Sequence, residues 1–259
     1  MRDLSSLISV FQIKFDKVFH LAAQSFVPFS YQAPAETLAI NVIGTSNLLE
    51  AIRITKQDPL IHICSSSEVY GQPDYTPIDE KHPLNPISPY GVSKVAEDRL
   101  GFAYYKSYGM KVVITRMFTH TGPRQHEALV TSNFAKQVAL IERGKQSPFL
   151  KVGNLKSVRT FADVRDTVRA YWMLKETMSG EVYNIGGQET MTISELIERL
   201  QELSTRTFVV EEDPSRLRPA DVTLQIPDCS KFQKETGWKP EIPFEKTLLD
   251  LLNYWRERV

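Results

Sequence analysis

The 259-residue sequence has only two cysteines, no excess of charge of either sign and no long apolar run. Cys64 and Cys229 form no metal or redox motif, so we expect no metal site and a reducing, cytoplasmic compartment. Lys plus Arg and Asp plus Glu both number 31, so no net charge directs the chain to nucleic acid or to a membrane surface. No apolar run approaches ~18 residues, so no transmembrane helix is expected.

The hydrophobic pattern alternates between strand-like and helix-like segments. In the first half, strands are expected at 16–23, 59–66 and 111–118, with long amphipathic helices at 36–56 and 88–108. Strands separated by long helices pair in parallel, which predicts a doubly wound α/β sheet over residues 1–122. In such sheets ligands bind beyond the carboxyl ends of the strands.

The second half, residues 123–259, has a looser pattern that predicts a smaller α+β substrate-binding lobe, with some segments returning to the first sheet. The expected helices cover 129–143, 163–178, 193–204 and 244–258. The expected short strands lie near 148–152, 181–185 and 207–211. The polar, Pro-containing segment 212–228 is expected to be a loop.

The stretch "SPYGVSK", residues 88–94, places Tyr90 and Lys94 one helical turn apart. Ser88 and Pro89 mark the start of the helix, which we expect to pack beside the strand that ends at Ser66. A lysine ammonium ~4 Å from a phenol lowers the phenol pKa by about three units before desolvation acts against it. The pair is either a proton-transferring couple, with Ser66 orienting the substrate oxygen, or an ordinary helix surface.

Tyr171 and Lys175 repeat the same spacing without a serine-bearing strand end before them, and we expect them to be a surface helix pair. The surrounding sequence, and not the spacing, therefore has to decide what Tyr90 and Lys94 do.

The segments "HLAAQS", "NVIGT", "SSSEVYG", "SPYGVSK" and "RTFADVRD" occur in the order and spacing of a known family. In this combination the chain resembles the extended short-chain dehydrogenase/reductases, or NAD-dependent epimerase/dehydratases, that modify nucleotide sugars. The resemblance covers essentially the whole chain. It implies a Rossmann-like sheet, a nicotinamide cofactor (NADP, with NAD possible) and a GDP-sugar substrate.

The resemblance implies a role for each matching residue. Ser66 matches the catalytic Ser/Thr, Tyr90 the acid/base, Lys94 the residue that tunes the tyrosine and holds the nicotinamide ribose, and Glu68 a carboxylate that removes a sugar proton. The residues implied to line the cofactor, besides Tyr90 and Lys94, are Ala22, Ala23 and Arg116. The residues implied to contact the substrate are Ser25, Ser66, Thr119, Val130, Asn133, Asn154, Arg159 and Arg218. Arginine suits a diphosphate because its guanidinium binds bidentately.

The sequence departs from the family pattern in three places. Thr119 stands where an Asn is usual, and its hydroxyl offers one hydrogen-bond donor where the Asn amide offers two. Thr160 stands where an acidic residue is common. The GxxGxxG loop that holds the cofactor diphosphate is absent, and the first glycine is Gly44. We therefore expect an N-terminally truncated Rossmann unit, for which a miscalled start codon, a truncated recombinant form or a shortened paralogue would each account.

The resemblance leaves two reactions open. Only Gln188–Leu217 separate "YNIGG" from "RPADV", and this compact lobe favours a reductase. Such an enzyme reduces the C4 ketone of GDP-4-keto-6-deoxy-mannose with NADPH, in GDP-rhamnose-type deoxysugar synthesis, with Tyr90 as general acid. The alternative is the 4,6-dehydration of GDP-mannose, a lyase reaction that oxidises C4, eliminates water with Glu68 as the C5 base and returns the hydride to C6.

A reading from another class also stays open at this point. Without the glycine loop, the chain could be a non-catalytic nucleotide-sugar-binding protein or a dimerisation partner. Helices 36–56 and 88–108 match the pair that forms the dimer interface in the family, so the resemblance implies a homodimer.

Overall fold

The computed structural model describes residues 1–217 and 219–259, which divide into two compact units. Unit 1 comprises 1–117, 170–185 and 227–238, and unit 2 comprises 118–169, 186–226 and 239–259. The elements of unit 1 are α1 (Leu4–Val10), β1 (Lys17–His20), α2 (Val27–Gln32), α3 (Pro34–Leu38), η1 (Ala39–Ile43), α4 (Gly44–Ile54), β2 (Leu60–Ser66), η2 (Ser67–Val69), α5 (Pro89–Tyr108), β3 (Val112–Met117), η3 (Glu176–Met178), β7 (Val182–Ile185) and α9 (Ser230–Thr236). Helix α7 (Val164–Trp172) begins in unit 2 and ends in unit 1.

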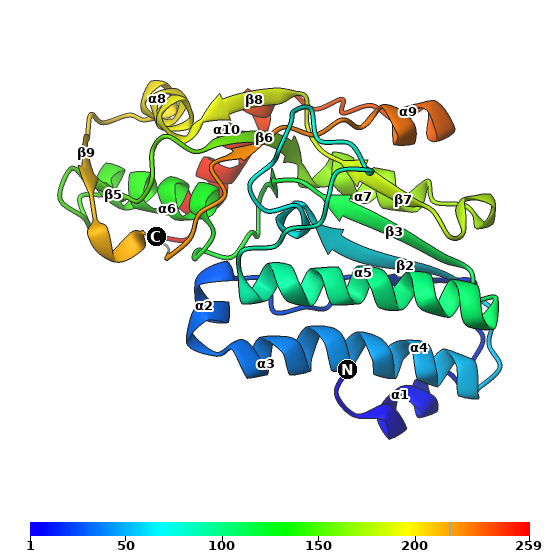
Figure 1. The fold of residues 1–259 in the computed structure, drawn as a ribbon. Coiled ribbons are helices and arrows are strands. Elements are labelled where there is room, and N and C mark those ends of the chain that lie inside the picture. The colour runs from blue at the N-terminus through cyan, green and yellow to red at the C-terminus, as the bar shows by residue number, and fades with distance from the viewer. Residues whose placement is uncertain (218) are drawn as a thin grey trace. The chain divides into compact units, whose positions relative to one another are not determined.

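Unit 1 is built on a four-stranded sheet in the order β1-β2-β3-β7, with every pair parallel. The sheet confirms the predicted parallel α/β fold, and its three predicted strands in the first half are present. β2 and β3 are buried along almost their whole length, as expected for strands covered on both faces. Helices α4 and α5 lie side by side and α5 packs on β2 and β3 (Figure 1).

The helix predicted at 36–56 is interrupted in an unexpected way. The structure has α3, then one π-helical turn (η1), then α4, and the three run on without a break. Asn41, inside the π turn, is buried and donates to the Ser93 hydroxyl of α5 at 2.8 Å. The widened turn therefore holds a polar contact between two neighbouring helices, a feature that a 3.6-residue period does not reveal.

Helix α5 matches the predicted helix at 88–108 closely. Ser88 accepts a hydrogen bond from the Gly91 amide at 3.0 Å, Pro89 occupies the first turn, and Gly109 ends the helix in the left-handed conformation. A Cβ on Gly91 would lie 2.8 Å from the carbonyl oxygen of Glu68. Glycine at this position therefore lets the start of α5 approach the chain that follows β2.

Unit 2 combines short strands with three longer helices. Its elements are β4 (His120–Thr121), α6 (Val130–Glu142), β5 (Phe149–Val152), β6 (Val158–Asp163), β8 (Glu189–Thr192), α8 (Ile193–Leu203), β9 (Val209–Glu212), η4 (Pro214–Arg216), β10 (Leu224–Gln225) and α10 (Phe244–Arg256). β6 pairs in parallel with β4 and β10 and antiparallel with β8, and β5 pairs in parallel with β9. Among these, β4, β6, β8 and β10 were not predicted from the sequence.

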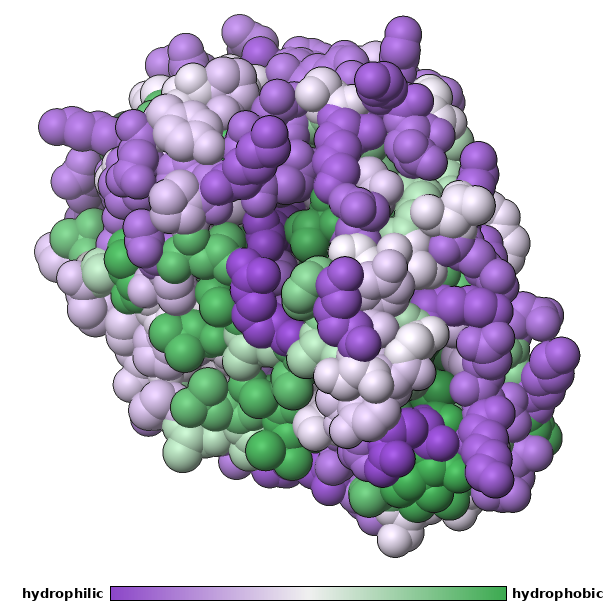
Figure 2. Space-filling view, turned by 45° about the vertical axis from the view of Figure 1, so that its right-hand side comes forward, coloured by the Kyte–Doolittle hydropathy of each residue, from purple (hydrophilic) through white to green (hydrophobic). Residues whose placement is uncertain are grey.

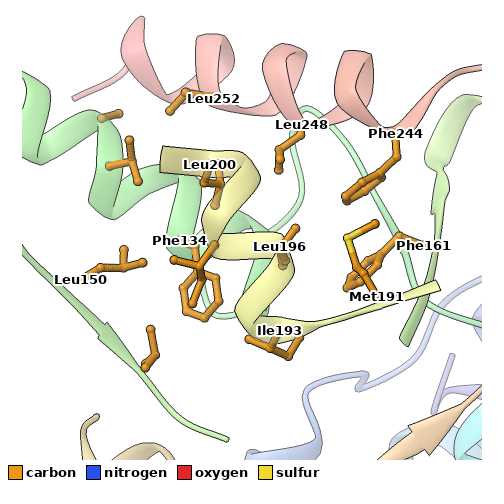
Figure 3. Close-up of a cluster of buried hydrophobic side chains, with 14 residues drawn as sticks. Phe134, Leu150, Phe161, Met191, Ile193, Leu196, Leu200, Phe244, Leu248 and Leu252 are labelled. Atoms are coloured by element: carbon orange, nitrogen blue, oxygen red, sulfur yellow. The ribbon is translucent and has the colours of Figure 1, made fainter. Parts of the chain in front are cut away.

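The core of unit 2 is entirely hydrophobic. Side chains of α6, α8 and α10 meet those of β5, β6 and β8, including Phe134, Leu150, Phe161, Leu196 and Leu248 (Figure 3). Helix α8 enters this core through a capping box in which Thr192 and Glu195 bond each other's backbone. The amphipathic pattern of α8 and α10 predicted both helices because it reflects this burial directly.

The surface is mixed in character. Hydrophobic side chains reach it in separate groups among larger hydrophilic areas (Figure 2). Within the described residues, no helix is both long and apolar enough to cross a membrane.

Candidate active site

Three of the four predicted catalytic residues converge where β2 ends and α5 begins. Ser66 is the last residue of β2, and Tyr90 and Lys94 lie on the first two turns of α5. All three are less than 10% exposed. The Ser66 side chain caps η2 by accepting from the Glu68 amide at 3.2 Å, and its hydroxyl acts to lower the pKa of Tyr90.

The Lys94 ammonium points into the unit. Its Nζ donates to the Cys64 carbonyl oxygen and to Glu97 Oε2, both at 3.0 Å, and it lies 6.0 Å from the centre of the Tyr90 ring. An ammonium has three N–H donors, so two are used inside the protein and one remains for another acceptor. Contact between this remaining donor and a ribose hydroxyl stays a prediction.

The electrostatics of Tyr90 differ from the prediction in one respect. The Lys94 charge and the Ser66 hydroxyl lower the pKa of Tyr90, as expected, but burial raises it by more, so the net shift is upward. The tyrosine is consequently protonated at neutral pH, which suits a group that donates a proton to a ketone oxygen.

Glu68 lies in η2, two residues after Ser66, and is half-buried. Its backbone carbonyl is the group that Gly91 approaches. The structure thus brings Glu68 to the same strand end as Ser66 and Tyr90.

The predicted cofactor residues divide into two kinds. Ala22 is exposed and Ala23 half-buried beyond the carboxyl end of β1, next to the end of β2, and Ser25 is exposed in the same segment. Arg116 is 2% exposed in β3, where its guanidinium donates to Asp98, the Tyr70 hydroxyl and the Glu80 carbonyl. Those bonds hold α5 to β3, and contact between Arg116 and a cofactor stays a prediction.

In unit 2, two predicted substrate residues meet through Asp221. Asn154 donates to Asp221 Oδ2 at 2.9 Å, and Arg159 Nη2 lies 3.8 Å from Asp221 Oδ1. Arg159 also donates to the carbonyl oxygens of Val158 and Val222. Asp221 thus fixes an amide and a guanidinium in one place.

A second group in unit 2 surrounds Asn133 on α6. Its side-chain oxygen accepts from Arg216 Nη1 at 2.8 Å. A Cβ on Gly153 would lie 3.0 Å from the Arg216 carbonyl oxygen, so glycine there permits the close approach of the segment that carries Arg216. Val130, at the start of α6, is 38% exposed.

The remaining substrate predictions are less informative. Thr119 is half-buried, and its carbonyl oxygen accepts from the Ala162 amide at 3.0 Å. Arg218 lies outside the described residues. Thr160, noted as a departure, is buried and pairs with the Thr190 hydroxyl at 2.8 Å across β6 and β8.

The prediction for Tyr171 and Lys175 was wrong for the tyrosine. Helix α7 ends at Trp172, and Tyr171 is buried with its hydroxyl 3.2 Å from the Cys64 sulfur. Its ring lies against His62, with the ring centres 4.4 Å apart, so Tyr171 is part of the interior of unit 1 and not of a helix surface.

The sequence model described as GDP-mannose 4,6 dehydratase matches residues 1–251 of the chain. The chain belongs to this family. GDP-6-deoxy-D-mannose reductase from Pseudomonas aeruginosa is 36% identical over 247 residues, which cover 94% of this chain and 81% of the relative. GDP-mannose 4,6-dehydratase from Yersinia enterocolitica is 30% identical, and the match covers 97% of this chain and 76% of the relative.

Solved structures support the same membership. The structure of RMD from Pseudomonas aeruginosa complexed with NADPH superposes with a TM-score of 0.93 at 34% identity, over 100% of this chain and 87% of that one. UDP-glucose 4-epimerase from Thermus thermophilus, in complex with NAD, superposes with a TM-score of 0.89 at 27% identity, over 100% and 83%. The Rossmann-like fold and the extended short-chain dehydrogenase/reductase resemblance are thereby confirmed.

Three residues that the sequence analysis did not single out contact predicted site residues within their own units. They are Glu97, Asp221 and Arg216. Glu97 follows Lys94 by one helical turn, a spacing that was readable, but its neighbours Asp98 and Arg99 made the segment look like an exposed helix face. Asp221 lies in the "RPADV" segment and could have been weighed as a partner for Arg159.

Proposed function

We propose that this protein reduces the C4 ketone of GDP-4-keto-6-deoxy-mannose with NADPH. The observation that carries the proposal is the convergence of Ser66, Tyr90 and Lys94 at the carboxyl end of β2. The similarity to a GDP-6-deoxy-D-mannose reductase and to a structure complexed with NADPH supports the choice of substrate and cofactor. NAD is the alternative cofactor.

The residues of unit 1 fit a nicotinamide cofactor in two respects. The remaining Lys94 donor can bond a ribose hydroxyl, and the small side chains of Ala22 and Ala23 leave the end of β1 open to a flat ring. The sequence contains no GxxGxxG loop, so the phosphate-holding part of a dinucleotide site is not among these 259 residues. When bound, NADPH supplies the hydride.

The protein side chains then have separate tasks. Ser66 orients the C4 oxygen, and Tyr90, protonated at neutral pH, donates a proton to it as negative charge develops. The positive charge of Lys94 lowers the free energy of the resulting buried phenolate. In unit 2, the proposed partners of the diphosphate or base are Arg159 and Asn154, together with Val130, Asn133 and Arg218. Thr119 of unit 2 and Ser25 of unit 1 are proposed to contact the sugar.

A second reaction, the 4,6-dehydration of GDP-mannose, is favoured by the position of Glu68. A carboxylate two residues after Ser66 could remove the C5 proton during elimination of water. The similarity to GDP-mannose 4,6-dehydratases supports this alternative.

One pair of incubations separates the two reactions. With GDP-4-keto-6-deoxy-mannose and NADPH, we expect stoichiometric loss of NADPH and formation of a reduced sugar. With GDP-mannose and no added NADPH, we expect no reaction. Loss of water from GDP-mannose would overturn the reductase proposal in favour of the dehydratase. Absence of both reactions, with retained binding of the GDP-sugar, would favour a non-catalytic nucleotide-sugar-binding or dimerisation role.

We further propose a homodimer formed through helices 36–56 and 88–108. Exposed hydrophobic residues on these helices support it, among them Ile43, Ile54, Val92 and Phe102. Light scattering is expected to give twice the chain mass, and Phe102→Asp is expected to give the chain mass. The two free thiols support a cytoplasmic location.

A further inference from the structure

Lys94 has a charged partner that the proposed reaction does not use. Glu97 accepts from Lys94 Nζ at 3.0 Å, and the side chains are 5% and 1% exposed for Lys94 and Glu97. Both partners lie on α5, and Glu97 lies one turn further along the helix from Tyr90 than Lys94 does. Burying both members of an ion pair carries a desolvation cost that only good geometry and further hydrogen bonds offset.

The carboxylate is held on one side only. Its second oxygen, Oε1, is buried without a hydrogen-bond partner among the described residues. The neighbouring Thr45 hydroxyl donates to the Asn41 carbonyl oxygen at 2.6 Å and interacts with the carboxylate only secondarily. Glu97 is therefore held in place mainly by Lys94, so a substitution of either residue changes the position and the electrostatic environment of the other.

The groups around the pair are mostly neutral at pH 7. They come from four elements: His20 of β1, His62 and Cys64 of β2, Tyr90 of α5 and Tyr171 of α7. Burial lowers the pKa of His20 to about 4 and that of His62 to about 3, and it raises the pKa of Cys64. None of these five groups carries a negative charge near neutral pH, so of Glu97 and these five groups, only Glu97 can offset the Lys94 charge.

We propose that Glu97 is a positioning residue that sets how strongly the Lys94 charge acts on the Tyr90 hydroxyl. The bond to Glu97 draws one N–H of the ammonium away from Tyr90 and partly neutralises its charge. This inference rests on the proposed role of Tyr90 as the proton donor. It adds a residue that keeps the tyrosine protonated.

The direction of the effect follows from the charges. Burial raises the pKa of Glu97 to about 7, while the Lys94 charge lowers it, so the carboxylate is ionised above neutrality. At the higher pH where Tyr90 titrates, Glu97 is therefore already ionised, and its charge raises the pKa of Tyr90 while the Lys94 charge lowers it. Removing the carboxylate charge leaves Lys94 to act alone, so the pKa of Tyr90 falls.

The test compares Glu97→Gln and Glu97→Asp with the unchanged protein. The Tyr90 ionisation is followed by NMR of isotope-labelled tyrosine rings, and Tyr90→Phe assigns the signal. We expect Glu97→Gln to lower the pKa of Tyr90 by about one unit. Glu97→Asp, whose shorter carboxylate sits farther from Nζ, is expected to lower it by less. The basic limb of the reduction rate should move with the tyrosine.

Glu176→Gln is the matched control, because Glu176 pairs with Lys111 at 3.2 Å on the surface, where it is 62% exposed. It is expected to leave the Tyr90 pKa unchanged. A Tyr90 pKa that is unchanged or raised in Glu97→Gln overturns the proposal. If that variant does not fold, Glu97→Asp decides: an unshifted pKa overturns the proposal and a lowered one supports it.

The NMR readout needs no turnover, so the two proposals can fail separately. A shifted Tyr90 pKa in a protein that reduces no keto sugar would support the Glu97 assignment and refute the substrate. An unshifted pKa in an active reductase would refute the Glu97 assignment alone.

Discussion

The two units bury their charges in different ways. In unit 1, both members of the pairs Lys94–Glu97 and Arg116–Asp98 are at most 5% exposed. In unit 2, the buried carboxylates Asp163 and Asp166 pair with arginines whose side chains are 44% and 34% exposed. Charge is therefore enclosed in unit 1 and connected to solvent in unit 2.

The hydrophobic interiors show the same contrast. Unit 2 has one continuous apolar cluster formed by α6, α8, α10 and the strands β5, β6 and β8. In unit 1 the apolar cluster comes mainly from α4, β2 and β3, and the buried ionisable side chains His20, Lys94 and Glu97 are not part of it. Enclosing both members of an ion pair carries a desolvation cost that solvent-connected pairs largely avoid, so the two units should respond differently when one partner of a pair is removed.

The largest expected effect concerns activity in unit 1. Tyr90→Phe removes the proposed proton donor and is expected to lower turnover by about 10²–10⁴-fold, measured as NADPH consumption. Thermal unfolding should change little, because the ring still fills its place. Tyr183→Phe, at a buried tyrosine of β7 in the same unit, is the control and should remain active. Full turnover by Tyr90→Phe would refute the site.

The next effect is on the stability of unit 1. Asp98→Ala leaves the Arg116 guanidinium buried without its carboxylate and is expected to cost about 3–5 kcal/mol in denaturant unfolding. Lys246→Ala breaks an exposed pair with Asp250 and is expected to cost less than about 1 kcal/mol. Equal losses in the two variants would contradict the distinction between enclosed and solvent-connected charge.

How far the sequence could go depends on what each feature requires. The start of α5 was predictable because Ser88 and Pro89 act locally, and the end of β2 was predictable because its residues up to Cys64 are apolar except for His62. Strands β6, β8 and β10 were not, because β6 pairs with segments some 30–65 residues further along the chain that carry mixed polar residues. The hydrophobic pattern within a short segment does not show which distant segment will pair with it.

The same distinction between local and distant determinants applies to the predicted site. Ser66, Tyr90 and Lys94 were predictable because one helix and one strand end fix them. The net direction of the Tyr90 pKa was not, because it depends on how completely other elements exclude water from the hydroxyl. Glu97 was missed for the same reason: nothing in "VAEDRL" says that this carboxylate faces inward.

A third prediction tests the apolar interior of unit 2. Leu196, at the centre of α8, is fully buried, and Leu196→Ala is expected to cost about 2–5 kcal/mol of unfolding free energy. The loss should be the same at every pH, because no ionisable group is involved. Leu249→Ala, on the exposed side of α10, is the control and should fall within about 0.5 kcal/mol of the unchanged protein. A cost below about 1 kcal/mol at Leu196 would mean that the core repacks.

The smallest effect is the pH dependence that the enclosed groups of unit 1 give to stability. Burial lowers the pKa of His20 from 6.5 to about 4, so its contribution is present above pH 6.5 and is lost as the pH falls through about 4. The full contribution is about 3 kcal/mol. His20 is neutral in the folded protein, and its Nε2 donates to Thr45 at 2.8 Å, because the Thr45 hydroxyl itself donates to Asn41.

Glu97 acts in an overlapping range with the opposite sign. Its raised pKa gives a contribution that is present below 4.5 and is lost as the pH rises through about 7, so the profile of the unchanged protein alone does not isolate His20. The measurement is therefore the difference in unfolding free energy between His20→Gln and the unchanged protein, followed from pH 7 to pH 4. As the pH falls, the unfolding free energy of the unchanged protein should drop relative to that of His20→Gln, because only the unchanged protein has a histidine at this position to protonate. The same comparison with Leu196→Ala should stay flat, and a flat His20→Gln difference would show that water reaches this histidine and that unit 1 does not enclose its charges.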